Sequence, residues 1–223
     1  MSEHATTASV SEALVAGLLA AVGPQVTDLH GHSWEEIETA VRDHMAKLTE
    51  QNKARIIDSP SRQWLLLASM ILAVYRELLP LVGDERTGLS ILHNAMAALF
   101  KEHLTGYIAD RIGISQDAPE EAFNRIAENF KARGEEHFGK AYIYVQEVQD
   151  EGRSFVNIQK CFFDDFFRVN GMPELTPIFC AMDNLWAEEL EKPRYKVRFE
   201  RPTTLAQGDD VCRFQFTKMT AKP

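Results

Sequence analysis

The sequence predicts an α+β fold, with a helical N-terminal half packed on a small antiparallel sheet formed by the C-terminal half. Apolar residues recur at helical spacing through residues 10–135, and a period-two alternation begins near residue 141. The alternation returns near residue 195, after two further helical segments. The resulting order, strand–strand–helix–helix–strand–strand, is typical of helices laid on an antiparallel sheet.

We expect a single domain over residues 1–223. The chain is 45% hydrophobic and 26% charged, which is ordinary for a globular protein of a length that supports one core. Residues 1–9 are small and polar and are expected to be disordered. Residues 10–135 are expected to form the helical layer, and residues 140–218 the sheet and the two helices that carry the motifs.

The net charge of the chain and the length of its apolar runs argue against some kinds of binding partner. The net charge of -9 argues against nucleic acid and against an anionic membrane surface. The apolar runs Ala13–Val22 and Trp64–Val74 are too short to span a bilayer, and no secretory signal precedes them. Three cysteines without C-x-x-C spacing indicate reduced thiols. We expect a soluble, cytoplasmic protein; whether it is a monomer or a homo-oligomer stays open.

Capping residues and breakers delimit the expected helices. Ser33 is a good N-cap with Glu36 as its capping-box partner, and Ser59 precedes Pro60 at the start of a central, buried helix. Pro80 and Gly83 are expected to end that helix, and Gly134 the last one of the helical layer. The expected helices cover residues 11–22, 34–52, 60–80, 85–111 and 117–134.

Two hairpins and two helices are expected after residue 140. The first hairpin turns at residues 149–152 and the second around Gln207–Asp209. Asp164 or Asp165 is expected to cap the short helix between them, and the nearby phenylalanines to pack in the core. The expected ranges are 141–148 and 154–159 for the first pair of strands, 164–169 and 176–191 for the helices, and 195–201 and 211–217 for the second pair.

Cys180 and Asp183 form the first candidate site. With Thr176 as N-cap and Pro177 at the first helical position, Cys180 would lie at the edge of the first turn, where the helix dipole favours a thiolate. Asp183 shares its face and opposes ionisation, so it suits a proton carrier or a substrate-orienting group better than an activator. Judged on this pair alone, a small buried Cys180 and an exposed Asp183 are the commoner interpretation.

Other segments hold weaker candidates. Cys161 ends a strand, and Cys212 lies on the inward face of another strand, where a core role is favoured. The segment Arg201–Asp209 offers a guanidinium, two hydroxyls and a glycine-containing turn, and is equally well explained as an anion-binding loop or a plain hairpin turn. His30 and His32 could bind a metal, but two histidines spaced i, i+2 in a loop are a weak signal. No local Ser-His-Asp signature and no nucleotide-binding motif occurs.

An ordered set of short motifs in the last third of the chain resembles the L-2-amino-thiazoline-4-carboxylic acid hydrolase family. The motifs are Cys161-x-x-x-x-Phe166-Phe167, Gly171-x-Pro173-Glu174-Leu175, Phe179-Cys180-x-x-Asp183, Arg201-x-x-Thr204-Leu205-Ala206-x-Gly208-Asp209 and Cys212-x-Phe214-x-Phe216. The resemblance implies a hydrolase that opens a cyclic amidine- or amide-like C–N bond in a small-molecule substrate. In the family's founding activity, a 2-aminothiazoline-4-carboxylate ring becomes N-carbamoyl-cysteine. It implies no metal and no cofactor.

Roles are assigned as hypotheses on the matching positions. Cys180, or in second place Cys161, attacks the amidine carbon or stands beside it, and Asp183 passes a proton to the ring nitrogen. Arg201 and Thr204 hold the substrate carboxylate. Cys212 and Glu174 complete the expected substrate-binding set. No motif histidine accompanies the cysteines, so a Cys–His nucleophile pair is not predicted.

Two other classes of function stay open from the sequence. A helical layer over a sheet can enclose an apolar pocket, so a small-molecule sensor or carrier is one alternative. In that interpretation Cys161, Cys180 and Cys212 could bind a metal, although no pair has ligand-loop spacing. A helix-rich interaction subunit is the other, and it would leave the cysteine motifs without a purpose.

Overall fold

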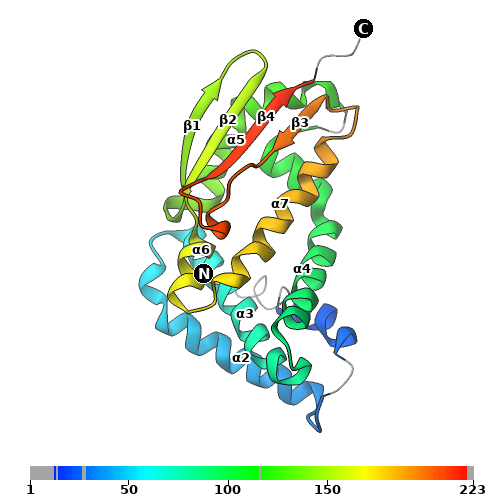
Figure 1. The fold of residues 1–223 in the computed structure, drawn as a ribbon, viewed down its shortest axis with the longest axis vertical. Helices are drawn as coiled ribbons and strands as arrows, with labels where there is room; N and C mark the ends of the chain where they lie inside the picture. The colour runs from blue at the N-terminus through cyan, green and yellow to red at the C-terminus, as the bar shows by residue number, and fades with distance from the viewer. Residues whose placement is uncertain (1–12, 14, 27–28, 116, 220–223) are drawn as a thin grey trace, which may run out of the picture.

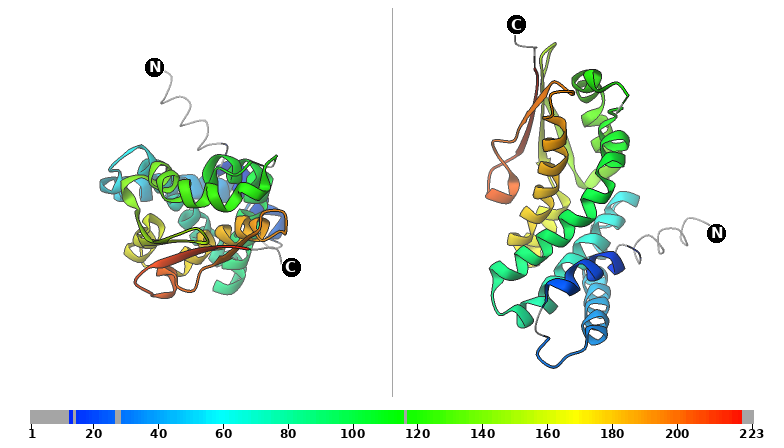
Figure 2. Two further views of the ribbon diagram at one scale, coloured as in Figure 1. Left: turned by 90° about the horizontal axis from the view of Figure 1, so that it is seen from above. Right: turned by 90° about the vertical axis from the view of Figure 1, so that its right-hand side faces the viewer.

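The fold is α+β, as the sequence predicts. The computed structural model describes residues 13, 15–26, 29–115 and 117–219, so the N-terminal residues 1–9, expected to be disordered, lie outside the described part. Long helices form one half of the molecule and a four-stranded sheet lies at the other end (Figure 1). In the right-hand view of Figure 2, helix α7 lies between the sheet and α4.

The second helix begins where its capping residues predict, and the expected start of the first helix at Ser11 lies outside the described residues. Residues 15–22 are helical and pass into a 3-10 turn at Gly23–Gln25. Helix α2 (Trp34–Gln51) starts with the expected capping box, in which the Glu36 backbone N–H donates to Ser33 Oγ (3.2 Å) and the Ser33 N–H donates to Glu36 Oε2 (2.7 Å). The capping box thereby satisfies two of the backbone donors at this helix end.

Helix α3 (Ser59–Val82) is the central helix of the fold. Its N-cap is Asp58, one residue earlier than predicted, because the Asp58 carboxylate accepts from the Ser61 N–H (2.8 Å). Pro80 lies inside the helix, and the helix ends only at Gly83, which adopts a φ of 75°. By length and composition α3 could cross a membrane, but 61% of its most apolar window is buried within the protein, as in the core helix of a globular fold.

Helix α4 (Glu85–Tyr107) continues as a π-helical turn at Ile108–Ile112. Helix α5 (Ala122–Phe138) passes through Gly134, where the sequence predicts its end. A Cβ at Gly134 would lie 2.7 Å from a ring carbon of Tyr144, so this glycine allows close packing of the helix on the sheet. The helix ends instead at Gly139, with a φ of 72°.

The sheet has the strand order β1-β2-β4-β3, with every neighbouring pair antiparallel. Strands β1 (Ile143–Gln149) and β2 (Arg153–Lys160) form the first hairpin, and β3 (Val197–Glu200) and β4 (Cys212–Lys218) the second pair. Helices α6 (Phe162–Val169) and α7 (Thr176–Leu190) connect the pairs. The arrangement follows the predicted order of elements.

The inner face of the sheet packs against α5 and α7. Trp186 of α7 and Phe130 of α5 contact the rings of Phe214 and Phe216 on β4. The inward positions of β4, Cys212 included, are buried, as its alternation predicts. These packed aromatic side chains form one side of a cavity between the helices and the sheet.

Candidate active site

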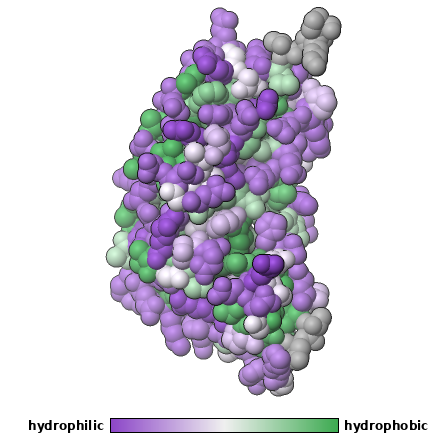
Figure 3. Space-filling view, in the orientation of Figure 1, coloured by the Kyte–Doolittle hydropathy of each residue, from purple (hydrophilic) through white to green (hydrophobic). Residues whose placement is uncertain are grey.

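One large cavity, of about 620 Å³, lies among α3, α4, α5, α7 and the inner face of the sheet. Its lining is dominated by aromatic and aliphatic side chains, whereas the face shown in Figure 3 is mostly hydrophilic with scattered hydrophobic residues. A concave apolar site with a few polar groups is the usual form of a small-molecule site. The polar groups that enter it are therefore the candidates for chemistry.

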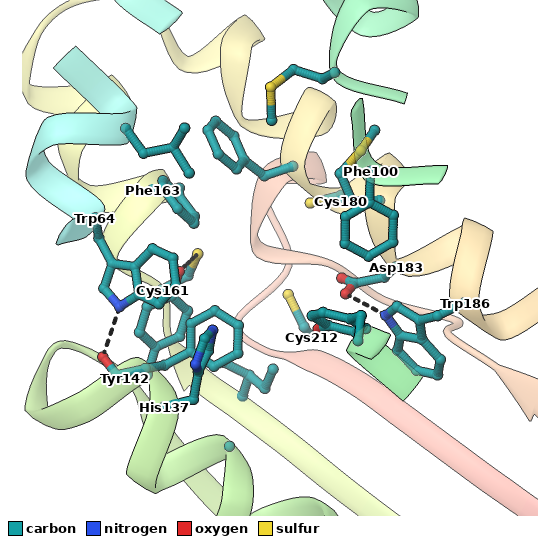
Figure 4. Close-up of a pocket in the computed structure, with 18 of the residues that line it drawn as sticks. Trp64, Phe100, His137, Tyr142, Cys161, Phe163, Cys180, Asp183, Trp186 and Cys212 are labelled. Carbon is teal, nitrogen blue, oxygen red and sulfur yellow. Dashed lines mark hydrogen bonds between the residues drawn. The ribbon is translucent and has the colours of Figure 1, made fainter. Parts of the chain in front are cut away.

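Several predicted site residues meet at one end of this cavity. Cys180 and Asp183 come from α7, Arg201 from the segment after β3, and Cys212 from the start of β4. We call Cys180, Asp183, Trp186, Arg201 and Cys212 the polar end. Figure 4 shows Asp183 beside Trp186, with the sulfurs of Cys180 and Cys212 nearby. Segments that are far apart in the chain thus bring a carboxylate, a guanidinium and two thiols to one site.

Arg201 is anchored against α7. Its Nη1 donates to Asp183 Oδ2 (2.7 Å), and its Nη2 donates to the Cys180 carbonyl (2.9 Å) and to Asn184 Oδ1 (3.1 Å). Only 10% of the Arg201 side chain is exposed. A planar guanidinium suits such a multidentate position.

Asp183 is the only carboxylate among the described residues that line the cavity. Its Oδ1 accepts from Trp186 Nε1 (3.1 Å) in addition to the bond from Arg201. Burial raises the pKa of Asp183, and the Arg201 guanidinium and both hydrogen bonds oppose that rise. Hydrogen bonds therefore fix the orientation of the Asp183 carboxyl group, and its pKa is higher than that of an exposed aspartate.

The structure disfavours the Cys180 thiolate that the sequence predicts. The N-cap of α7 is Leu175 rather than Thr176, and Cys180 is the fifth residue of the helix, beyond its positively polarised first turn. The thiol is half-buried, and burial followed by the Asp183 charge raises its pKa, against the smaller influence of Arg201. Burial and the Asp183 charge therefore both disfavour the Cys180 thiolate.

The other two cysteines also line the cavity as neutral thiols. Burial raises the pKa of Cys161 to about 12, and its Sγ donates to Tyr142 Oη (3.7 Å). Cys212 accepts from the Leu205 N–H (3.2 Å), and burial raises its pKa as well. Within the described part of the chain, no group of three or more His, Cys, Asp or Glu residues is placed to hold a metal ion.

Two predicted substrate-binding residues, Thr204 and Glu174, are not among the residues that line the cavity. The Thr204 N–H donates to Asp209 Oδ2 (2.9 Å), which closes the loop between β3 and β4 on itself. Neither Asp164 nor Asp165 caps α6 as expected, since Cys161 occupies the N-cap position without a capping bond. Asp164 instead pairs with Arg168 (2.7 Å).

The opposite end of the cavity was not predicted. Trp64, His137, Phe138, Tyr142 and Phe163 line it, and we call these residues the aromatic end. His137 lies edge-to-face with the Trp64 ring, with centroids 4.9 Å apart. The signal was available in the sequence: a helix that continues through Gly134 places His137 two turns after Phe130, on the same face.

Comparison with known protein families agrees with the site described above. The family model of L-2-amino-thiazoline-4-carboxylic acid hydrolase matches residues 63–216, which is more than half of the chain. The match extends well before the motifs of the last third and includes most of α3 and all of α4 and α5. A comparison with curated proteins found no match. The chain belongs to the L-2-amino-thiazoline-4-carboxylic acid hydrolase family.

Proposed function

We propose that this protein hydrolyses small cyclic amidine-like compounds related to 2-aminothiazoline-4-carboxylate, at the carbon between the ring sulfur and the two nitrogens. The observation that carries the proposal is the pairing of Asp183 with Arg201, beside Cys180, at one end of an otherwise apolar cavity. Membership of the hydrolase family supports the reaction class.

Charge complementarity orients the substrate at the polar end. Arg201 is the only lysine or arginine among the described lining residues, so we assign the substrate carboxylate to it. The amidine nitrogens then face Asp183, which accepts hydrogen bonds from them. Thr204, first expected to share the carboxylate with Arg201, does not line the cavity and is left out of this assignment.

Atom balance identifies the bond that opens. N-carbamoyl-cysteine keeps both nitrogens on the former amidine carbon, so forming it breaks the ring C–S bond rather than the C–N bond first expected. The water oxygen bonds to the amidine carbon and becomes the carbonyl oxygen. Asp183 accepts one proton from the attacking water and passes it to the leaving sulfur, and the second water proton goes to the ring nitrogen, which becomes the carbamoyl N–H. The raised pKa of the Asp183 carboxyl suits both steps of its transfer.

We assign the attack to water because burial and Asp183 keep the Cys180 thiol neutral. In the covalent alternative, Cys180 Sγ bonds to the amidine carbon while Asp183 takes the thiol proton and passes it to the ring sulfur, which leaves. Water then cleaves the bond to Cys180 Sγ: its oxygen becomes the carbonyl oxygen, and its protons go to Cys180 Sγ and to the ring nitrogen. Both routes need Asp183. Only the covalent route needs the Cys180 sulfur, so the two are separated by Cys180→Ala.

A carrier or sensor is the second candidate function, and the predominantly aromatic lining of the cavity favours it. Such a protein would bind the same class of compound without converting it. Asp183 and Arg201 would then serve only to orient the ligand. Saturable binding without product would favour this function over hydrolysis.

Incubation of purified protein with 2-aminothiazoline-4-carboxylate tests the proposal. Hydrolysis at the C–S bond releases a free thiol without ammonia, whereas loss of the exocyclic nitrogen releases ammonia without a thiol. We expect stoichiometric thiol release by wild type and by Cys180→Ala. Ammonia without thiol contradicts the bond assignment, and loss of turnover in Cys180→Ala with retained folding favours the covalent route.

A further inference from the structure

The cavity has two chemically different ends. The polar end holds the carboxylate and the guanidinium, and the aromatic end is built from rings that contact one another. The Trp64 ring lies 5.1 Å from Phe138 and 5.8 Å from Phe163, and Phe138 lies 4.6 Å from Tyr142, between centroids. Figure 4 shows Trp64, Phe163, Tyr142 and His137 on one side of the cavity and Asp183 and Trp186 on the other.

Two polar groups at the aromatic end have partners within the protein. Trp64 Nε1 donates to the Phe138 carbonyl (3.2 Å), and the Tyr142 hydroxyl accepts from Cys161 Sγ (3.7 Å). The surface that this end presents to a ligand is therefore predominantly aromatic. Aromatic side chains in such an arrangement favour a flat apolar group by burial and by offset or edge-to-face ring contacts.

The size of the cavity exceeds what the reacting ring needs. A volume of about 620 Å³ falls in the range that holds drug-sized ligands, roughly 300–1,000 Å³. A 2-aminothiazoline-4-carboxylate has far fewer atoms than such a ligand. When its carboxylate lies at Arg201 and its amidine at Asp183, the ring occupies the polar end and leaves the aromatic end unfilled.

We infer that the physiological substrate is an aryl-substituted cyclic amidine, with its reacting ring at the polar end and its aryl group among Trp64, Phe138, Tyr142 and Phe163. This inference rests on the proposed function for the position of the ring. It adds the substrate class: the aryl group supplies much of the binding energy, and the polar end orients the reacting carbon.

Binding of two ring-stable analogues tests the inference. The aromatic thiazoles 2-aminothiazole-4-carboxylate and 2-(phenylamino)thiazole-4-carboxylate differ only by the phenyl group, and their rings resist hydrolysis. Calorimetric titration of wild type should give a Kd at least about tenfold lower for the phenyl compound, the factor expected for burying an aromatic ring. A phenyl compound that binds no more tightly than its parent, or no binding by either compound, overturns the inference.

A pair of tryptophan variants locates the phenyl group. In Trp64→Leu, the phenyl compound should bind less than about threefold more tightly than its parent, because the aryl group loses its largest ring contact. Trp34→Leu, which replaces a half-buried tryptophan that does not line the cavity, should keep the preference for the phenyl compound. If both variants lose the preference for the phenyl compound to the same extent, the assigned location of the phenyl group is overturned. If Trp64→Leu fails to fold, Phe163→Leu takes its place with the same expectation.

These outcomes are separable from failure of the proposed function. The analogues report binding alone, so the inference about the aryl group is decided whether or not the protein turns over a thiazoline. Absence of thiol release from 2-aminothiazoline-4-carboxylate and from its phenylamino derivative contradicts hydrolysis. Faster thiol release from the unsubstituted compound, together with equal binding of the two analogues, leaves hydrolysis intact and removes the aryl substrate.

Discussion

Arg201 Nη1 lies 2.7 Å from Asp183 Oδ2, which joins the segment after β3 to the middle of α7. The side chain of Arg201 is 10% exposed and that of Asp183 is 29% exposed, so solvent screens this ion pair only weakly. The pair has two consequences. It fixes the orientation of the cavity's one described carboxylate, and it sets a positive charge beside the position that we assign to the substrate carboxylate.

Removal of the guanidinium should destabilise the fold. Arg201→Met leaves the Asp183 carboxylate without its cation, and breaking a largely buried pair costs roughly 3 kcal/mol of unfolding free energy. Arg198→Met is the matched control, because Arg198 pairs with Glu200 on the solvent-exposed part of β3 and should contribute less than about 1 kcal/mol. Chemical denaturation of both variants measures the difference. Equal, small effects would show that the Arg201–Asp183 pair is not a buried constraint.

Asp183 should give stability a specific pH dependence. Burial raises its pKa above the ordinary 3.8, so the folded protein holds this proton more tightly than the unfolded chain does. The stabilisation from protonated Asp183 is complete at pH values below the pKa of this group in the unfolded chain. It is lost as the pH rises through the higher pKa of Asp183 in the folded protein. Relative to Asp183→Asn, wild type should therefore lose unfolding free energy as pH increases from about 4. A relative gain over that range would mean that Arg201 outweighs burial.

The cysteines should react slowly with thiol reagents in the folded protein. Burial raises the pKa of all three, that of Cys161 to about 12, and only the thiolate is nucleophilic. At pH 8 we expect labelling at least about a hundredfold slower than in denaturant, where the thiols ionise normally. A fast phase in native protein that disappears in Cys180→Ala would reveal a Cys180 thiolate and restore it as the nucleophile.

Gly134 should be intolerant of a side chain. In Gly134→Ala the new Cβ would lie 2.7 Å from the Tyr144 ring, and this overpacking should cost about 1–3 kcal/mol despite the better helix propensity of alanine. Gly106→Ala in α4 is the control, since no heavy atom lies within 4 Å of its added Cβ. That variant should gain up to about 1 kcal/mol. A tolerated Gly134→Ala would contradict the close packing of α5 on β1.

Most of the fold follows from local signals in the sequence. Alternation placed both strand pairs, and the Ser33–Glu36 capping box placed the start of α2. One error occurs where tertiary packing decides the local structure, and another in the choice between two adjacent capping residues. Helix α5 continues through Gly134 because the missing side chain makes room for Tyr144, and Asp58 rather than Ser59 caps α3 because its carboxylate reaches the Ser61 N–H.

The candidate site was predictable in part. Motif order indicated that Cys161, Cys180, Asp183, Arg201 and Cys212 belong to one site, and these residues do line one cavity. The spacing of residues in the sequence could not show that Arg201 pairs with Asp183, because that contact joins α7 to the segment that follows β3. Spacing also could not show that burial and the Asp183 charge raise the pKa of Cys180. The aromatic end depends on long-range packing of α3, α5 and β1, of which the sequence showed only the helical spacing of Phe130 and His137.

The rate of thiol release from 2-aminothiazoline-4-carboxylate by Asp183→Asn, compared with wild type, tests the central claim that Asp183 carries the proton. Asn184→Ala is the control, because it removes another acceptor of Arg201 but does not line the cavity. With folding verified by circular dichroism, we expect turnover to fall by about a hundredfold or more in Asp183→Asn, the contribution of a general acid–base group, and to persist in the control. Turnover of Asp183→Asn at the wild-type rate would contradict the account.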